Sequence, residues 1–389
     1  MLVLTITPIV LAGCGNDAAE PPDCVGDPQS IVFAVGGRQN SPVPQLSKPA
    51  IDLLADAVDS CGEIGIVGID GQPTFTGWLT DAGDVRDAKT QEWREIAISE
   101  YVNEVVGTTL PRVVADEPEA APLAALEVAA LSLGDVDEDH KRTIILVDSG
   151  LQTVDPFSFV TDFSISSEPS DAANYLKDDV QDLPDLTGLE VVWVGMGQTA
   201  APQPDLTVGQ RADLESIWRA VIERTGATVE FQDVPAGRAP SAKLPAVTVV
   251  PVAEPPPPPP TPTCETVTFK DATVKFVPDQ ATFLRPTEVD TILSSWAEQI
   301  STSDLQVHLI GTTATGTSQD KARDLSQRRA AAVRRVLIDQ GVDSRRVTSE
   351  GQGWWDRWHI HDWEDEQRIP EPAARNRKVV MLLSGEACA

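Results

Sequence analysis

The stretch Val307–Leu337, VHLIGTTATGTSQDKARDLSQRRAAAVRRVL, sets the fold of the last third of this chain. Its apolar start, Val307–Ile310, predicts a short strand, and a loop rich in glycine and threonine follows. We expect a helix from about Asp324, whose carboxylate can cap free backbone N–H groups, to a stop at Gly341. One face of this helix is apolar, because it carries Leu325, Ala332, Val333, Val336 and Leu337.

Three short motifs surround this strand, loop and helix. Gly311 ends the strand, Leu325-Ser326-Gln327-Arg328-Arg329-Ala330 opens the helix, and Asn376-Arg377-Lys378-Val379 begins a final apolar run. In this order the motifs resemble those of OmpA-like C-terminal domains, and the resemblance covers roughly the last third of the chain. It implies a non-catalytic α+β sandwich that holds peptidoglycan by its diaminopimelate side chains.

A diaminopimelate side chain carries an ammonium and a carboxylate, so its binding site needs an anion and a cation. The family uses an Asp three residues after the loop glycine and the Arg of Leu-Ser-x-x-Arg-Ala. By this resemblance Arg329 is the Arg, whereas Ala314 stands where the family has the Asp. We expect Arg329 to bind the carboxylate as a bidentate guanidinium pair, and Arg377 to support either the same site or the strand pairing near it.

The ammonium then needs another acceptor. Asp320 and Asp324 lie nearby in the sequence, and the hydroxyls of Thr312, Thr313 and Thr315 are neutral alternatives. We take Arg329, Arg377, Asp324 and Thr313 as the predicted peptidoglycan-binding residues.

Length and charge limit the remaining possibilities. A chain of 389 residues is long for one compact core, so two domains are expected. The net charge is −30 and the sequence pI is about 4.3. Such a surface repels nucleic acid, so nucleic-acid partners are excluded.

The chain begins with an apolar run, Leu2–Leu11, that leads into Leu11-Ala12-Gly13-Cys14. This resembles the lipobox of bacterial lipoproteins, in which the signal peptide is cut before the Cys and that Cys carries lipid, including palmitate. The run is too short to span a bilayer as a helix. No Lys or Arg precedes it, so we expect the true start of the signal peptide to lie upstream. Residues 1–14 are thus a predicted signal, 15–29 a tether, and the folded domains extracytoplasmic at a membrane of the cell envelope.

The other four cysteines predict disulfides, because an even number in an exported chain favours pairing. Cys24 and Cys61 each precede a predicted strand, and Cys264 and Cys388 bracket the C-terminal domain. We therefore expect Cys24–Cys61 and Cys264–Cys388. None has CxxC spacing or an adjacent His, so zinc binding is not supported.

Residues 30–237 alternate apolar strands with amphipathic helices, which predicts a doubly wound, mainly parallel α/β sheet. The expected strands are Ile31–Val35, Ile64–Ile69, Thr143–Val147, Val191–Val194 and Thr228–Phe231, and the expected helices are Ile51–Val58, Trp93–Val106, Leu123–Leu133 and one that runs from Thr207 to Gly226. The pattern weakly resembles a von Willebrand factor A-like domain.

That family's metal site needs Asp-x-Ser-x-Ser after the first strand. This chain has Gly37-Arg38-Gln39-Asn40-Ser41 instead, which lacks the first carboxylate. Asp70 and Asp148 follow two strands and can either bind a hard cation or simply cap loops. We predict no metal and no cofactor. GxSxG, P-loop and HExxH motifs are absent and only four histidines exist, so no enzyme is predicted.

Residues 238–263 predict a linker, with an unbroken proline run at Pro255–Pro260 that favours an extended polyproline II spacer. In residues 264–389 we expect further strands at Val267–Phe269, Val274–Phe276 and Val379–Leu383 and a helix from Pro286. An insertion from Gly353 to Trp363 holds four tryptophans and two histidines. Its rings can stack on sugars, His359 and His361 can ligate a metal, or the loop can fold its rings onto the domain.

Two functions remain from the sequence. The first is a non-catalytic lipoprotein, anchored in a lipid bilayer by Cys14 and bound to peptidoglycan by its C-terminal domain. The second keeps the C-terminal fold as a protein-interaction module, while the N-terminal domain binds an unknown protein partner or a metal ion.

Overall fold

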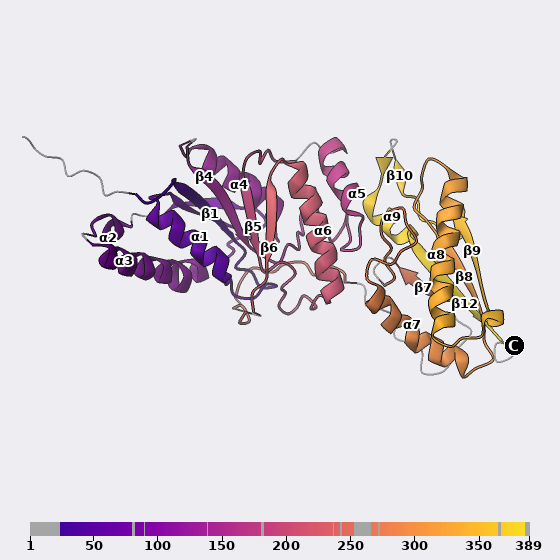
Figure 1. Cartoon of the computed structure of the whole chain (residues 1–389). Helices are drawn as coiled ribbons and strands as arrows, with labels where there is room; N and C mark the ends of the chain where they lie inside the picture. Colours follow the sequence, from indigo (N-terminus) through magenta and orange to yellow (C-terminus); the bar gives the residue numbers. More distant parts are fainter. Residues whose placement is uncertain are drawn as a thin grey trace, which may run out of the picture.

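The computed structural model describes residues 24–79, 82–88, 90–137, 139–179, 183–235, 237–241, 243–252, 266–270, 273–364 and 367–385. The chain forms two domains that lie side by side (Figure 1). Cys14, Cys264 and Cys388 lie outside the described residues, so the lipid site and the second disulfide stay predictions.

The first domain is built on a six-stranded sheet in the order β3-β2-β1-β4-β5-β6. Its strands are β1 (Gln29–Val35), β2 (Ile64–Gly68), β3 (Thr74–Trp78), β4 (Lys141–Val147), β5 (Glu190–Val194) and β6 (Thr228–Gln232). Neighbouring strands are parallel except β2 and β3. This confirms the expected mainly parallel sheet. The antiparallel edge strand β3 was not predicted.

Helices cover both faces of this sheet, because successive strand residues point to opposite sides. Ile31 and Phe33 pack against α1 (Lys48–Asp59) and α3 (Gln91–Glu104), which continues through η1 (Val105–Thr109) and η2 (Leu110–Arg112). Val32 and Ala34 lie in the other core. That core is covered by α4 (Pro122–Gly134) and α6 (Val208–Arg224), and the short helices are α2 (Gly83–Arg86), α5 (Pro169–Asn174) and η3 (Tyr175–Asp179).

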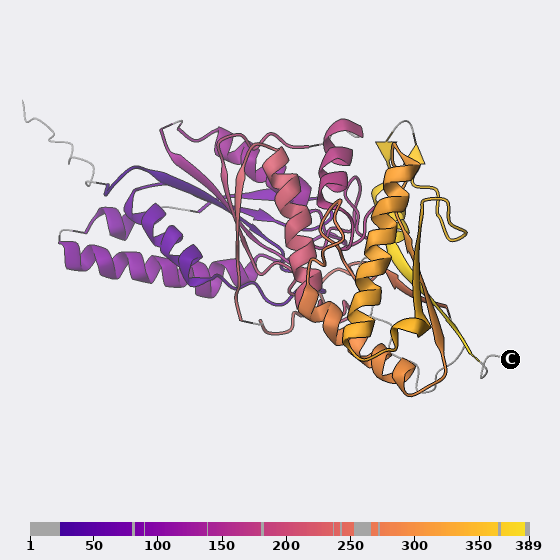
Figure 2. The same cartoon turned by 45° about the vertical axis from the view of Figure 1, so that its right-hand side comes forward.

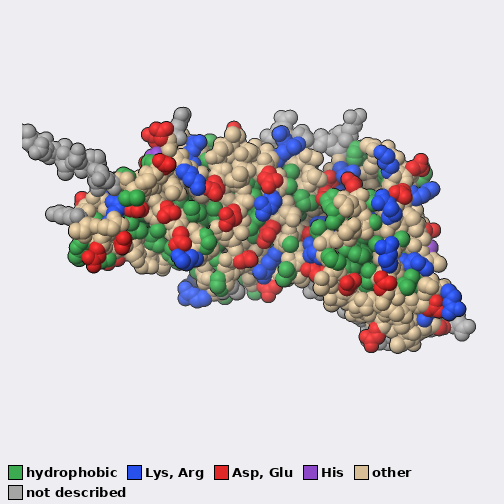
Figure 3. All heavy atoms as spheres, in the orientation of Figure 1, with side chains coloured by type: hydrophobic (Ala, Val, Ile, Leu, Met, Phe, Trp, Pro, Cys, Tyr) green, Lys and Arg blue, Asp and Glu red, His purple; other side chains and the backbone are tan. Residues whose placement is uncertain are grey.

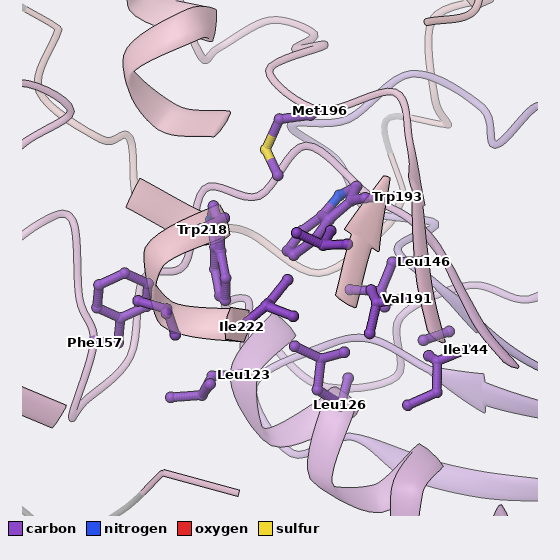
Figure 4. Packing of buried hydrophobic residues seen from close by; sticks show 14 of the residues in the cluster. Leu123, Leu126, Ile144, Leu146, Phe157, Val191, Trp193, Met196, Trp218 and Ile222 are labelled. Carbon is purple, nitrogen blue, oxygen red and sulfur yellow. The ribbon is translucent and has the colours of Figure 1, made fainter. Parts of the chain in front are cut away.

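The second core is rich in aromatic rings (Figure 4). Trp193 of β5 and Trp218 of α6 are fully buried, with ring centroids 4.7 Å apart. Their indole N–H groups donate to the backbone carbonyls of Asp148 and Gly150, at 2.9 and 2.8 Å. Buried tryptophans with satisfied N–H groups fix α6 on the sheet. The opposite side of α6 faces the C-terminal domain (Figure 1).

The predicted disulfide Cys24–Cys61 is present and ties the start of the domain to the end of α1.

The C-terminal end of the first domain lies beyond residue 238, where the sequence predicted the start of the linker. Val250, in the segment assigned to the linker, is fully buried in the second core, and its backbone exchanges hydrogen bonds with the Gln203 side chain. Residues 243–252 therefore run along the first domain.

The C-terminal domain has a four-stranded mixed sheet in the order β7-β12-β8-β9. The strands are β7 (Thr266–Lys270), β8 (Gln306–Thr312), β9 (Val347–Gly353) and β12 (Lys378–Ser384); β10 (Trp363–Glu364) and β11 (Gln367–Arg368) form a separate pair. Only β8 and β9 run parallel. Helices α7 (Pro286–Ser301) and α8 (Gln319–Asp339) lie together along one side of this sheet (Figure 2), and η4 (Ser344–Arg346) and α9 (Pro370–Asn376) complete the domain.

Two local predictions in this domain were wrong. Helix α8 begins at Gln319 rather than near Asp324, and its N-cap is Ser318, whose hydroxyl accepts a hydrogen bond from the Lys321 N–H at 3.5 Å. Val274–Phe276 is not a strand, because Phe276 makes only an isolated bridge to Phe283. Among the described residues, no helix combines the length and apolar character that crossing a membrane requires.

Candidate functional site

A cavity of about 330 Å³ opens at the start of α8, between the two domains. Its lining comes from the turn before α7, the loop after β8, the first turns of α8, the C-terminal segment and α5 with the residue before it. These residues are Glu168, Ser170, Pro278, Asp279, Thr313, Ala314, Gly316, Thr317, Ser318, Lys321, Ala322, Leu325, Arg329, Trp354, Trp363, Arg368 and Arg377. The predicted residues Arg329, Arg377 and Thr313 thus meet in one place, and Ala314 lies among them.

Close packing of α8 on the sheet positions the site. A Cβ on Gly311 would lie 2.1 Å from the Ser326 carbonyl oxygen, and one on Gly351 would lie 2.2 Å from the Gln327 nitrogen. Glycine at both positions therefore lets the helix rest directly on β8 and β9. The Ser326 hydroxyl accepts from the Gly353 N–H at 3.0 Å. The Leu-Ser motif thereby locks α8 to β9 and turns Arg329 inward.

Arg329 is only 7% exposed although it lines the cavity. Its Nε–H donates to the Gln280 carbonyl at 2.9 Å, and its guanidinium carbon lies 5.0 Å from the centre of the Phe276 ring. A guanidinium held over a ring and shielded from water attracts a carboxylate strongly.

Arg377 meets a carboxylate from the other domain. Its guanidinium pairs with Asp171 of α5, whose second oxygen lies 3.1 Å from Nη1 of Arg368. The side chains of Arg377 and Asp171 are 10% and 9% exposed. Arg368 also donates to the Thr315 carbonyl at 3.1 Å. One carboxylate of the first domain thus joins two arginines of the second at the edge of the cavity.

The residues predicted as acceptors for an ammonium group differ in whether they line the cavity and whether they already have a hydrogen-bond partner. Asp324 lies inside α8, is 68% exposed and pairs with Arg328 at 3.0 Å, so its role in binding stays a prediction that this geometry does not support. Neither it nor Asp320 lines the cavity. The Thr312 hydroxyl donates to the Asn376 carbonyl at 2.6 Å, and that of Thr315 lies 3.2 Å from His359.

Thr313 is the one of these threonines that lines the cavity. Its hydroxyl is buried and has no hydrogen-bond partner within the described part of the chain. A buried hydroxyl normally finds a partner, so Thr313 is available for one from a ligand.

The insertion rich in Trp and His braces this site. Asp362, which is fully buried, accepts from the Thr315 N–H at 3.0 Å and from the Asn376 amide at 2.9 Å. Asn376 also exchanges hydrogen bonds with the backbone of Ile360. The insertion therefore folds onto the domain and fixes the loop after β8, while Trp354 and Trp363 form part of the cavity wall.

Polar residues at the carboxyl ends of the strands in the first sheet are paired with each other and closed off from water, unlike those that line the cavity. Asp148 forms an ion pair with Arg38, and both side chains are 0% exposed. Arg38 also lies 3.3 Å from the Ser149 hydroxyl, and the Gly150 N–H donates to Asp148 at 2.7 Å. An arginine of the chain itself thus provides the positive charge beside Asp148.

Asp70, the other candidate at this edge, accepts three backbone N–H groups, from Gln72, Asp116 and Glu117, at 2.8 to 3.2 Å. It caps loops, one of the two roles that the sequence left open. No group of three or more His, Cys, Asp or Glu that could hold a metal occurs within the described residues, and this includes His359 and His361.

With this geometry in place, known proteins can be compared. The model of the OmpA family matches residues 275–369. Outer membrane protein A of Bordetella avium is 31% identical over 147 residues, which cover 38% of this chain and 71% of that protein. The chain belongs to the OmpA family.

Among solved structures, the OmpA-like domain of FopA1 from Francisella tularensis is 20% identical and covers 31% of this chain and 72% of its own, with a TM-score of 0.23. The peptidoglycan-associated lipoprotein from Burkholderia pseudomallei is also 20% identical, over 28% of this chain and 88% of its own, with a TM-score of 0.24.

The OmpA-family match includes Arg329 and stops short of Arg377. Sequence reasoning missed Lys321, Arg368 and Glu168, which also line the cavity. The insertion gave a signal for Trp354 and Trp363, since it was singled out as a possible stacking surface. Glu168 gave none, because only the docking of the two domains brings it to the cavity.

Proposed function

We propose that this OmpA-family chain is a non-catalytic lipoprotein of the cell envelope, and that the cavity at the start of α8 binds peptidoglycan by diaminopimelate side chains. The observation that carries the proposal is Arg329, a shielded guanidinium that lines an open cavity at the position of the family's carboxylate-binding Arg. Thr313 supports the proposal, since its buried hydroxyl lines the cavity and forms no hydrogen bond with the described residues.

The test is sedimentation of the full-length chain with purified sacculi, followed by competition with free meso-diaminopimelate. We expect the chain to sediment with the sacculi and to be released by the free amino acid. A folded chain that stays in the supernatant would count against wall binding.

The lipid anchor rests on the sequence alone. Cys14 follows a run that fits a signal peptide with a small-residue cleavage site. The protein expressed from its native locus is expected to partition with membranes, and Cys14→Ser is expected to release it. Equal membrane association of the two would remove the anchor from the proposal.

A second candidate function is a protein-interaction module. Two observations favour it: Ala314 offers no carboxylate, and Asp171 already occupies Arg377 and Arg368. On this alternative the N-terminal domain binds a protein partner and the OmpA-family domain has kept its fold without its ligand. The sacculus experiment separates the two candidates.

A further inference from the structure

Although Ala314 replaces the carboxylate that the family has in this cavity, two other carboxylates line it. Glu168 and Asp279 both line it, on opposite sides of the domain boundary in the sequence. Asp279 is exposed and sits on a turn with a φ of 54°, before α7. Glu168 is half-buried and comes from the first domain.

The backbone at Glu168 is held firmly, whereas its side chain is available. Glu168 is the N-cap of α5, and its carbonyl accepts from the N–H groups of Asp171 and Ala172 at 3.0 and 3.2 Å. Pro169 restricts the chain directly after it. The carboxylate forms no hydrogen bond or ion pair with the described residues. A half-buried carboxylate of this kind is ready to accept from a cationic ligand.

Ion pairs across the domain boundary fix where Glu168 lies. Asp171, three residues later, pairs with Arg368 and Arg377 at the cavity. A second buried carboxylate, Asp213 of α6, pairs with Lys275 at 3.1 Å and with Arg285 at 2.9 Å. Burial, the largest single influence, lowers the pKa of Arg285, but the hydrogen bond and charge of Asp213 together with those of Glu288 outweigh it and raise this pKa above its ordinary value.

These contacts give the cavity both of the charges that a zwitterionic ligand requires. Arg329 and Lys321 of α8 provide the cations, and Glu168 provides an anion with no competing partner among the described residues. Asp171 cannot serve as readily, since both of its oxygens already face arginines.

We propose that the first domain completes the wall-binding cavity, with Glu168 as the acceptor for the ammonium of diaminopimelate while Arg329 binds its carboxylate. This inference rests on the proposed function and adds to it a residue outside the matched family segment. It makes ligand selectivity depend on the docking of the two domains.

The test measures equilibrium binding of two small probes to the full-length chain. These are meso-diaminopimelate and pimelate, which has the same carbon chain and carboxylates but no ammonium groups. The wild type is expected to prefer diaminopimelate. Glu168→Gln is expected to weaken diaminopimelate binding roughly ten- to a hundredfold, as for the loss of a charged hydrogen-bond partner. Pimelate binding should change far less.

The control is Glu223→Gln, which removes one exposed carboxylate from α6 away from the cavity. It should leave the affinities for both probes unchanged. If Glu168→Gln binds diaminopimelate as the wild type does, or more tightly, the inference fails while wall binding stands. If the wild type binds neither sacculi nor diaminopimelate, the proposed function fails, and the inference with it.

A second variant tests the role of Asp171 as a positioning residue. Asp171→Asn weakens the contacts that hold α5 against Arg368 and Arg377. The preference for diaminopimelate over pimelate should fall, because Glu168 loses its fixed place. Retention of full selectivity in a folded Asp171→Asn chain would contradict the dependence on domain docking.

Discussion

Each domain places an arginine beside polar groups near the end of a strand, yet the two arginines are used differently. Arg38 is sealed at 0% exposure against Asp148, and the pocket beside that pair is only about 20 Å³. Arg329 faces a cavity of about 330 Å³ and is anchored by a carbonyl and a ring. An arginine paired with a carboxylate at the edge of its own sheet and closed off from water stabilises the fold, whereas one that lines an open cavity is placed where a ligand can reach it.

The two domains also differ in their net charge. More than half of its 30 Lys and Arg residues lie in residues 264–389, although the whole chain carries −30. Figure 3 shows Lys and Arg side chains on the C-terminal domain interspersed with acidic ones. The acidic excess therefore belongs mainly to the first domain, and the cavity lies where the two surfaces meet.

Breaking the sealed pair should have the largest effect on stability. Arg38→Met leaves the Asp148 carboxylate buried without its cation, which typically costs about 3–5 kcal/mol. Denaturant unfolding measures the loss. The control is Lys48→Met, because the pair of Lys48 with Asp52 is largely exposed and should change stability by less than about 0.5 kcal/mol. Similar losses in both variants would show that the Arg38–Asp148 pair is not structural.

Removing the disulfide of the first domain should have an effect of similar size. Cys24 and Cys61 are 37 residues apart, and closing such a loop stabilises the fold by about 4 kcal/mol on the chain-entropy model. The double variant Cys24→Ser/Cys61→Ser should unfold at lower denaturant concentration yet still bind sacculi while folded. Non-reducing peptide mapping of the wild type should also return Cys264–Cys388; free thiols there would contradict the second pair.

The next effect is on binding rather than on stability. Arg329→Ala should lower the affinity for sacculi by roughly ten- to a hundredfold, about 1.5–3 kcal/mol, because a charge-assisted contact is lost. Arg328→Ala is the matched control, since Arg328 is the adjacent residue, is 53% exposed and pairs with Asp324 on the surface of α8. Equal sedimentation of wild type and Arg329→Ala would mean that the family's fold is kept here without its function.

The sequence predicted the features of the two domains that depend on residues close together in the chain. Alternating apolar strands and helices predicted the mainly parallel sheet, and the Leu-Ser-x-x-Arg-Ala motif identified Arg329. Asp324 was misplaced because helix-forming residues upstream extend α8 to Ser318, whose hydroxyl provides the cap. Val274–Phe276 looked like a strand because its apolar residues enter the core, although they form only an isolated bridge and no continuous strand pairing.

What the sequence could not show is the contact between the domains. Asp171 and Glu168 lie in a segment with no motif, and nothing local indicates that α5 meets Arg377. Likewise Arg38 appeared only inside a motif that lacks the metal-binding carboxylate, because its partner Asp148 is more than a hundred residues away in the sequence. Long-range ion pairs decide which candidate site is sealed and which is open.

The smallest expected effect comes from restoring the family's carboxylate. Ala314 is 8% exposed and lines the cavity, so Ala314→Asp places an anion beside the proposed ammonium position. In the wild type this should strengthen diaminopimelate binding by less than about tenfold, because Glu168 already serves as acceptor and the new carboxylate must lose part of its hydration. In a Glu168→Gln background the same change should recover more affinity, since the two carboxylates would share one role and their effects would not add. Ala314→Asn, nearly the same size but neutral, is the control in both backgrounds. Equal gains from Ala314→Asp with and without Glu168 would show that the two positions act independently, and that the first domain does not replace the missing family residue.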